Sequence, residues 1–393
     1  MVDIKKFLLN KKNPLDYKMM GIILILVSIG IIILASASSY FALNEYDDSN
    51  YFWVRQLGFA VAGIIIMLVV SCIDYKLYKK LSYLGFVLTL LLMVAVLIPG
   101  IGHSAKGATR WINLGFTTFQ PSELMKTVLV LTASTYLALN VKKLVDIKRI
   151  KDIKIYIPLV LMLVAIMSIM YLQDHLSGTL VMIVAVASVF WSSGVKINMK
   201  YIIGILLVGI IGVSIFIFGD AIEFTDNGIE FGHSFRLQRI TAFMNPEEDL
   251  QGSNWQAAQS LYAIGTGNIF GLGIGQSRQK YLWLPEAQND FIFSVLGEEF
   301  GLIGTVTVLG LFMFFIYRGL YIAIKCNDLY GTIIATGITM VYAFQIMVNI
   351  AVVTCSMPVT GMPLPFFSYG GTALLINLAT MGILLNISRN IKE

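Results

Sequence analysis

The chain contains a series of long apolar runs, among them GIILILVSIGIIIL and LGFVLTLLLMVAVLI, separated by short polar stretches. Lipid offers the backbone no hydrogen-bond partners, so a run of about 20 apolar residues that crosses a bilayer must be helical. With 57% hydrophobic and 13% charged residues and a mean hydropathy of +0.78, the 393-residue chain does not fit an ordinary soluble protein. The pattern predicts an all-α polytopic membrane protein.

The apolar runs predict about ten transmembrane helices in a single membrane domain, residues 1–393, that begins with a polar leader at residues 1–18. The first run lacks the small-residue cleavage site of a signal peptide, so we expect it to remain as a helix. The predicted spans are residues 19–43, 54–73, 81–99, 121–141, 156–173, 177–194, 199–219, 290–317, 331–356 and 367–387.

Basic residues are concentrated on one side of this topology, which holds 20 of the 28 Lys and Arg side chains. By the positive-inside rule this side is cytoplasmic, and an even number of spans places both termini there. The formal net charge of +5 therefore describes the cytoplasmic flanks, and no nucleic-acid partner is predicted.

Residues with metal or redox chemistry show no recognisable spacing. Cys72, Cys326 and Cys355 lie in or beside predicted spans without paired spacing, which is typical of small packing residues. The three histidines are scattered, so we assign them no chemistry.

The outward side is predicted to have two long loops, residues 100–120 and residues 220–289, the second between helices seven and eight. Long loops within a compact bundle are usually functional or disordered, and these are rich in aromatic and apolar residues. In the second loop NWQAAQSLYAIG predicts an amphipathic helix in the membrane plane. The glycines of GTGNIFGLGIG follow no predicted strand, so we interpret them as turns rather than a nucleotide-binding loop.

The first segment with candidate chemistry is ATRWINLGFTTFQPSELMK, which predicts Arg110 and Trp111 just outside the membrane. Pro121 suits the first position of a helix, and Glu123 and Lys126 then share one face of its first turns. Ionisable groups at this depth are costly, so they either pair with each other or face a wet cavity. We favour a substrate-binding role, and the alternative is an internal ion pair that joins two helices.

The second segment, RQKYLWLPEAQNDFIFSVLGEEFG, has an acid at the membrane edge, Asp290, which we predict to be a general base. Partial burial tends to raise the pKa of a carboxyl group, and a raised pKa suits proton transfer near neutral pH. Glu298 is expected about 12 Å deeper on nearly the same helix face, so both acids are predicted to line one groove. Arg278 and Lys280 are candidate phosphate contacts. The alternatives are a helix-terminal role for Asp290, an ion pair for Glu298 and interfacial snorkelling for the two cations.

The third segment, TGMPLPFFSYGGTALL, has prolines that interrupt the structure before the final helix. Ser368 is predicted to line a cavity, and a tightly packed helix entry is an equally supported interpretation. Arg55, in the second span, adds a cation near the outward surface.

These three segments, in this order and at this spacing, are similar to the signature regions of the SEDS family of glycan polymerases, the FtsW, RodA and SpoVE group. The similarity extends from Arg55 to the final helix, and HLSGT and SRQKYLWLPE resemble the division and sporulation branch. Two departures occur: Thr109 stands where a second basic residue is frequent, and LQDHLSGT replaces a proline-aspartate-leucine-glycine run. The second departure leaves Asp174 without an assigned role.

The resemblance implies a peptidoglycan glycosyltransferase that polymerises lipid II at the outer face of the bacterial cytoplasmic membrane. It implies a class B penicillin-binding protein, a transpeptidase, and other division or sporulation membrane proteins as partners. No organic cofactor is implied, and a divalent cation is compatible with the chemistry. The family's essential acid corresponds to Asp290, and other signature positions correspond to Arg110, Trp111, Glu123 and Lys126.

Two other functions use the same features. A lipid II flippase predicts a charged path that reaches the cytoplasmic side, and a scaffold for division proteins does not need the outward charges. The ionisable residues cluster outward apart from the basic flanks, which favours the polymerase.

Overall fold

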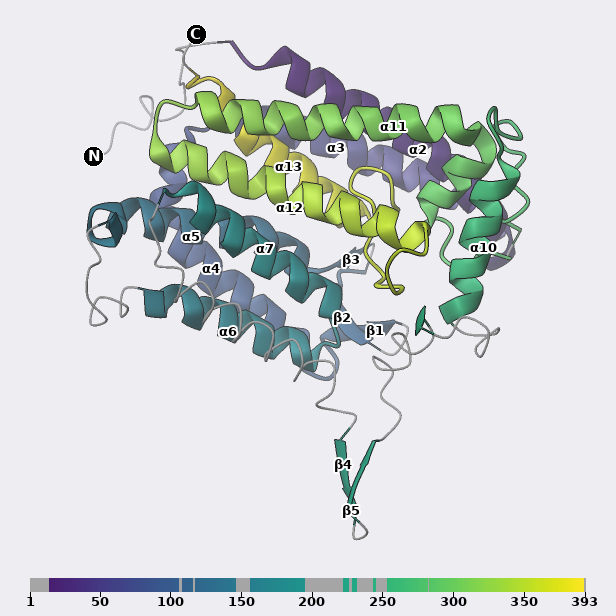
Figure 1. Ribbon diagram of the computed structural model, residues 1–393, viewed down its shortest axis with the longest axis horizontal. Coiled ribbons are helices and arrows are strands. Elements are labelled where there is room, and N and C mark those ends of the chain that lie inside the picture. The colour runs from purple at the N-terminus through teal and green to yellow at the C-terminus, as the bar shows by residue number, and fades with distance from the viewer. Residues whose placement is uncertain are drawn as a thin grey trace.

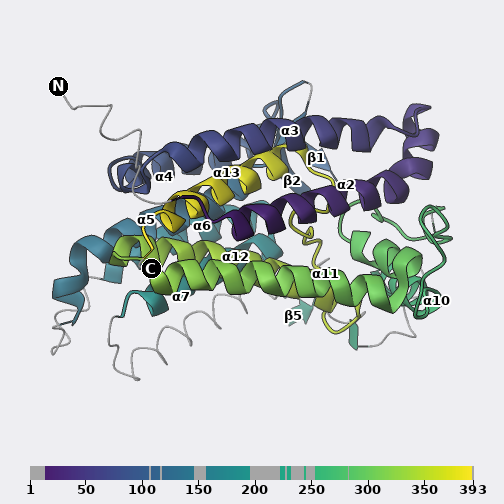
Figure 2. The ribbon, with the colours of Figure 1, turned by 90° about the horizontal axis from the view of Figure 1, so that it is seen from above.

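A computed structural model describes residues 14–105, 108–115, 117–145, 156–194, 222–225, 228–231, 243–244, 253–281 and 283–391. Its long helices run roughly along one direction, as two perpendicular views show (Figures 1 and 2). The start of the first described helix lies beside the end of the last one, since the Asp16 backbone N–H donates to Ser388 Oγ at 3.1 Å. The proximity of these two helix ends agrees with the predicted topology, in which both termini lie on the same side of the membrane.

Nine of the ten predicted spans coincide with helices among the described residues. The predicted span 199–219 lies outside them, so the count of ten stays a prediction. By length and composition, seven helices of the described part can cross a membrane, and α6 and α7 are shorter apolar helices. The helices are α2 (Tyr17–Tyr46), α3 (Tyr51–Cys72), α4 (Tyr78–Ala95), α5 (Pro121–Val145), α6 (Ile157–Leu172), α7 (Leu176–Ser192), α10 (Ser253–Thr266), α11 (Ile292–Lys325), α12 (Leu329–Val353) and α13 (Gly371–Ser388), with a 3₁₀ turn η1 at Tyr75–Leu77.

The described part of the chain is mostly helical, as predicted, but it also contains short strands that the prediction of an all-α fold did not include. The predicted loop 100–120 forms an antiparallel sheet in the order β1-β2-β3, and a separate hairpin joins β4 to β5. These strands have two to six residues, too few for an alternating pattern to be distinguished from a loop. Their bounds are β1 Gly102–Ala105, β2 Ala108–Asn113, β3 Thr118–Phe119, β4 Ile222–Thr225 and β5 Gly228–Phe231.

Helix α11 is interrupted at Gly301, whose φ of 62° and ψ of −160° are not helical. The backbone of the loop after α10 makes the hydrogen bonds that α11 lacks there. Leu302 N donates to Asn268 O at 2.9 Å, and Leu272 N donates to Glu298 O at 2.9 Å. The predicted turns of the glycine-rich segment therefore form part of the bundle.

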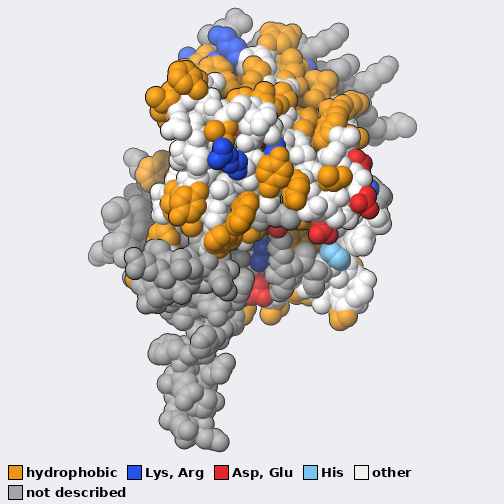
Figure 3. All heavy atoms as spheres, turned by 90° about the vertical axis from the view of Figure 1, so that its right-hand side faces the viewer, with side chains coloured by type: hydrophobic (Ala, Val, Ile, Leu, Met, Phe, Trp, Pro, Cys, Tyr) orange, Lys and Arg blue, Asp and Glu red, His pale blue; other side chains and the backbone are white. Residues whose placement is uncertain are grey.

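Apolar side chains are exposed on the end of the molecule formed by α10 and the loops after it (Figure 3). Tyr262, Phe270 and Trp283 on these segments are 61%, 80% and 57% exposed. Aromatic residues of this kind are enriched where a membrane meets water, which supports the predicted interfacial position of α10.

The opposite end is held by buried polar contacts. Arg318 and Asp16 form an ion pair at 2.8 Å between α11 and the start of α2. Asn386 of α13 is fully buried, donates to Ser71 O at 2.7 Å and accepts from Tyr75 N at 2.9 Å. Hydrogen bonds from one side chain to two other segments fix the ends of the helices relative to each other.

Candidate functional site

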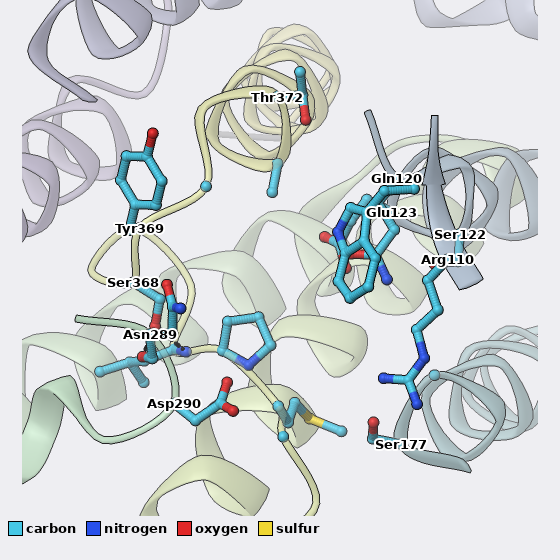
Figure 4. Close-up of a pocket in the computed structure, with 18 of the residues that line it drawn as sticks. Arg110, Gln120, Ser122, Glu123, Ser177, Asn289, Asp290, Ser368, Tyr369 and Thr372 are labelled. Atoms are coloured by element: carbon cyan, nitrogen blue, oxygen red, sulfur yellow. Dashed lines mark hydrogen bonds between the residues drawn. The ribbon is translucent and has the colours of Figure 1, made fainter. Parts of the chain in front are cut away.

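A cavity of about 1160 Å³ opens where all three segments with candidate chemistry meet. Its walls come from α3, β2, the N-terminal ends of α5 and α7, and the loops before α11 and α13. Figure 4 shows Asp290 on one wall, with Arg110, Glu123 and Ser177 on the opposite wall. The predicted site residues on the walls are Arg55, Arg110, Trp111, Glu123, Lys126, Asp290 and Ser368.

Asp290 lies in the turn that precedes α11, since the helix begins at Ile292 rather than at residue 290. Asn349 of α12 holds this turn, because its Nδ2 donates to Asp290 O and to Met362 O, each at 2.8 Å. Asn349 is 1% exposed, so both hydrogen bonds are shielded from water. One buried amide thus joins the Asp290 turn to the loop before α13.

Ser368 makes a second link between the same two segments. Its hydroxyl donates to Asn289 O at 2.7 Å and accepts from Leu364 N at 2.7 Å. Gln56 of α3 binds the same loop, since its Nε2 donates to Ser368 O at 3.3 Å. Ser368 therefore lines the cavity while its hydroxyl stabilises the wall.

On the opposite wall Glu123 and Lys126 form an ion pair at 2.7 Å, and both residues also line the cavity, so the two arrangements that the sequence left open occur together. Both side chains are at least nine-tenths buried, so removal of either leaves an uncompensated charge. Arg110 donates from Nε to Gln173 O at 3.1 Å and also donates to Asp174 O, at the end of α6. Trp111 lies beside it on β2, opposite His103 of β1.

Sequence analysis missed His175, which lies in the turn before α7 and also lines the cavity. Burial, with the positive charges of Arg110 and Lys126, lowers the pKa of His175 to about 3, so the imidazole is neutral near pH 7. Its Nδ1 is buried and has no hydrogen-bond partner in the part of the chain that the structure describes. No spacing rule indicated this residue, since its neighbours come from β2 and α5.

Arg55 is exposed at the edge of the cavity. Its guanidinium lies 4.0 Å from the centroid of the Tyr51 ring, and Tyr51 in turn stacks on Tyr46 at 3.8 Å. Such stacking restricts the orientation of the guanidinium while its N–H edges stay accessible to a ligand.

Three predicted substrate-binding residues, Arg278, Lys280 and Glu298, do not line this cavity. The predicted groove with Asp290 and Glu298 on one helix face is wrong, because Asp290 precedes the helix. Glu298 is fully buried and accepts from Ser277 Oγ at 2.5 Å, from Arg278 N at 2.9 Å and from Gln279 N at 3.3 Å.

The two cations of this segment differ in exposure. Lys280 is buried, where its Nζ lies 3.5 Å from Glu299 Oε1 and donates to Gly275 O at 2.7 Å. The Arg278 side chain is exposed. Substrate contacts for these residues stay predictions. Within the described part of the chain, no group of three or more His, Cys, Asp or Glu residues is placed to hold a metal ion.

The helices and the polar cavity between them define a polytopic helical membrane protein. A family model described as FTSW_RODA_SPOVE, cell cycle protein, matches residues 17–393. The chain therefore belongs to the FtsW/RodA/SpoVE family, and it is a multi-pass membrane protein.

Proteins similar to this chain include named members of the same family. The chain is 40% identical to stage V sporulation protein E of Bacillus subtilis, covering 96% of this chain and 98% of that protein. It is 37% identical to the probable peptidoglycan glycosyltransferase FtsW of Trichlorobacter lovleyi, covering 96% and 94%. Among solved structures, the chain is similar to one from work on the structural coordination of polymerization and crosslinking by a peptidoglycan synthase complex. The TM-score is 0.75 at 25% identity, and the match covers 95% of this chain and 98% of that chain. The rod shape determining protein RodA of Thermus thermophilus gives a TM-score of 0.67 at 25% identity, covering 96% and 98%.

Proposed function

We propose that this protein is a peptidoglycan glycosyltransferase that polymerises lipid II at the outer face of the bacterial cytoplasmic membrane. The names of the FtsW relatives support the activity. The observation on which the proposal chiefly depends is the cavity, in which Asp290 faces a wall that contains Arg110 and Lys126. Aromatic residues, cations and a carboxylate around one cavity suit a substrate with sugars and a diphosphate.

In the proposed reaction, the Asp290 carboxylate takes the proton of the 4-hydroxyl of the acceptor's N-acetylglucosamine. The hydroxyl oxygen forms a bond to the anomeric carbon of the donor's N-acetylmuramic acid, with inversion. The bond from that carbon to the phosphate oxygen breaks, and undecaprenyl diphosphate leaves with the electron pair. Arg110, Lys126 and Arg55 stabilise the negative charge that grows on the diphosphate, which is usually the largest contribution to catalysis.

The partner is proposed to be a class B penicillin-binding protein, together with other division or sporulation membrane proteins. The solved complex to which the chain is similar couples polymerisation with crosslinking. Crosslinking requires a transpeptidase, which is the activity of this class of partner.

The test supplies purified protein with labelled lipid II, with and without a class B penicillin-binding protein from the same organism, and separates the glycan strands on a gel. Wild type is expected to form strands, and Asp290→Asn to form them at least about 10²-fold more slowly, as for loss of a general base. Asp74→Asn is the control, because it lies beside η1 and an amide oxygen can still accept its hydrogen bond from Lys76 N. Normal polymerisation by Asp290→Asn would show that the base assignment is wrong.

A lipid II flippase is the alternative function. If wild type forms no strands with its partner present, while lipid II crosses vesicle membranes, transport is the function and the polymerase proposal is wrong.

A further inference from the structure

The wall opposite Asp290 contains the start of α7, where residues Asp174 to Gly178 all line the cavity. The N-cap residue, His175, makes no side-chain hydrogen bond to the helix. The first N–H groups of a helix have no partner within it, and the helix dipole places about half a positive charge at this end. A 17-residue helix of this kind therefore begins on the cavity without a side-chain cap.

Two buried polar atoms without partners belong to residues of the same wall. Ser122, in the first turn of α5, is 3% exposed and its Oγ has no hydrogen-bond partner among the described residues. His175 is 8% exposed and its Nδ1 has none. Buried polar groups are nearly always hydrogen-bonded, so two such atoms on the wall of one cavity are suited to bind a ligand that enters it.

The formal charges of this wall balance, which limits the kind of anion site it can form. Arg110 and Lys126 are the cations, Glu123 is paired with Lys126, and the Asp174 side chain is exposed near Arg110. An anion bound at this wall would be held by N–H and O–H donors and by the helix dipole, rather than by an excess of cations.

We propose that the N-terminus of α7, with Ser122, His175 and Arg110, binds the diphosphate of the departing polyprenyl lipid. This inference rests on the proposed function and assigns the leaving group to one wall. This assignment places the sugar in the space between that wall and Asp290, whose two sides Figure 4 shows. The attacking oxygen and the leaving oxygen are on opposite sides of the anomeric carbon, as a substitution with inversion requires.

The test measures binding of undecaprenyl diphosphate, the proposed product, to the full-length protein in nanodiscs by native mass spectrometry. Undecaprenol serves as the uncharged comparison and inorganic pyrophosphate as a competitor. Wild type is expected to bind undecaprenyl diphosphate more tightly than undecaprenol. Added inorganic pyrophosphate is expected to displace the bound undecaprenyl diphosphate. Ser122→Ala and His175→Phe are each expected to weaken binding about tenfold, as for the loss of one charge-assisted hydrogen bond.

Ser134→Ala is the matched control. Ser134 lies on α5, as Ser122 does, is fully buried and also has a hydroxyl without a partner among the residues described, but it does not line the cavity. It is expected to bind as wild type does. Equal affinity for undecaprenol and the diphosphate, or unchanged binding by both Ser122→Ala and His175→Phe, would overturn the inference. Asp290→Asn is expected to bind the diphosphate normally while it loses polymerisation, so failure of the subsite and failure of the proposed function are separate results.

Discussion

Replacement of Asn349 by leucine, which has nearly the same shape, removes the only two hydrogen bonds that its amide nitrogen makes among the described residues, those to Asp290 O and Met362 O. Each hydrogen bond contributes about 1 kcal/mol net, and a buried carbonyl left unpaired costs about 1–3 kcal/mol. We expect Asn349→Leu to lower the free energy of unfolding by about 2–4 kcal/mol.

The turn that holds Asp290 loses its attachment to α12 in this variant. A misplacement of a catalytic group by about 1 Å can cost about 10²-fold in rate. We therefore expect the maximal rate of strand formation, corrected for the folded fraction, to fall by about that factor. The KM for lipid II is expected to change little, because the base acts in the chemical step.

Asn386→Leu is the matched control. This asparagine is also buried in a helix and also makes two hydrogen bonds to other segments, but at the end of the bundle away from the cavity. Thermal unfolding in detergent and initial polymerisation rates are measured for both variants. A similar loss of stability with a rate defect only in Asn349→Leu supports the positioning role. Equal corrected rates in the two variants would refute it.

Two further predictions concern buried charge and protonation. Glu298→Gln is expected to lower the free energy of unfolding by about 2–4 kcal/mol, because an amide cannot accept all three hydrogen bonds from residues 277–279. The KM for lipid II is expected to stay unchanged. An increased KM with normal thermal unfolding would instead support a role in substrate binding. His175 has a folded-state pKa of about 3, below its unfolded value near 6.5, so its contribution to stability is fully present above about pH 6.5 and decreases as the pH falls towards 3. Between these pH values the free energy of unfolding of His175→Phe is expected to fall less steeply than that of wild type, by up to about 1.4 kcal/mol per pH unit. Identical pH profiles for wild type and His175→Phe would contradict the lowered pKa of His175.

Local patterns in the sequence predicted the helices and one wall of the cavity well. Apolar runs of membrane length can form only helices, and the three-residue spacing of Glu123 and Lys126 placed them on one helix face, where they form an ion pair. The convergence of the three polar segments could be inferred only from the family resemblance, because no local pattern describes which loops meet.

The incorrect prediction of a groove with Asp290 and Glu298 has one physical cause, which is extrapolation of a helix past its true start. A helix continued back from residue 292 would align Asp290 with Glu298, whereas the turn before α11 directs Asp290 into the cavity and leaves Glu298 to bind a loop. Ser122, His175 and Asn349 were missed for a different reason. Their importance comes from burial and from contacts with distant segments, and neither property is visible in residue type or spacing.

The interruption of α11 at Gly301 has a mechanical consequence. Since the loop 268–273 supplies backbone hydrogen bonds on both sides of the break, this loop and the first turns of α11 must be displaced together. Those turns begin two residues after Asp290. A force on the exposed loop is therefore transmitted through peptide groups, without any flexible side chain in between, to the position of the carboxylate.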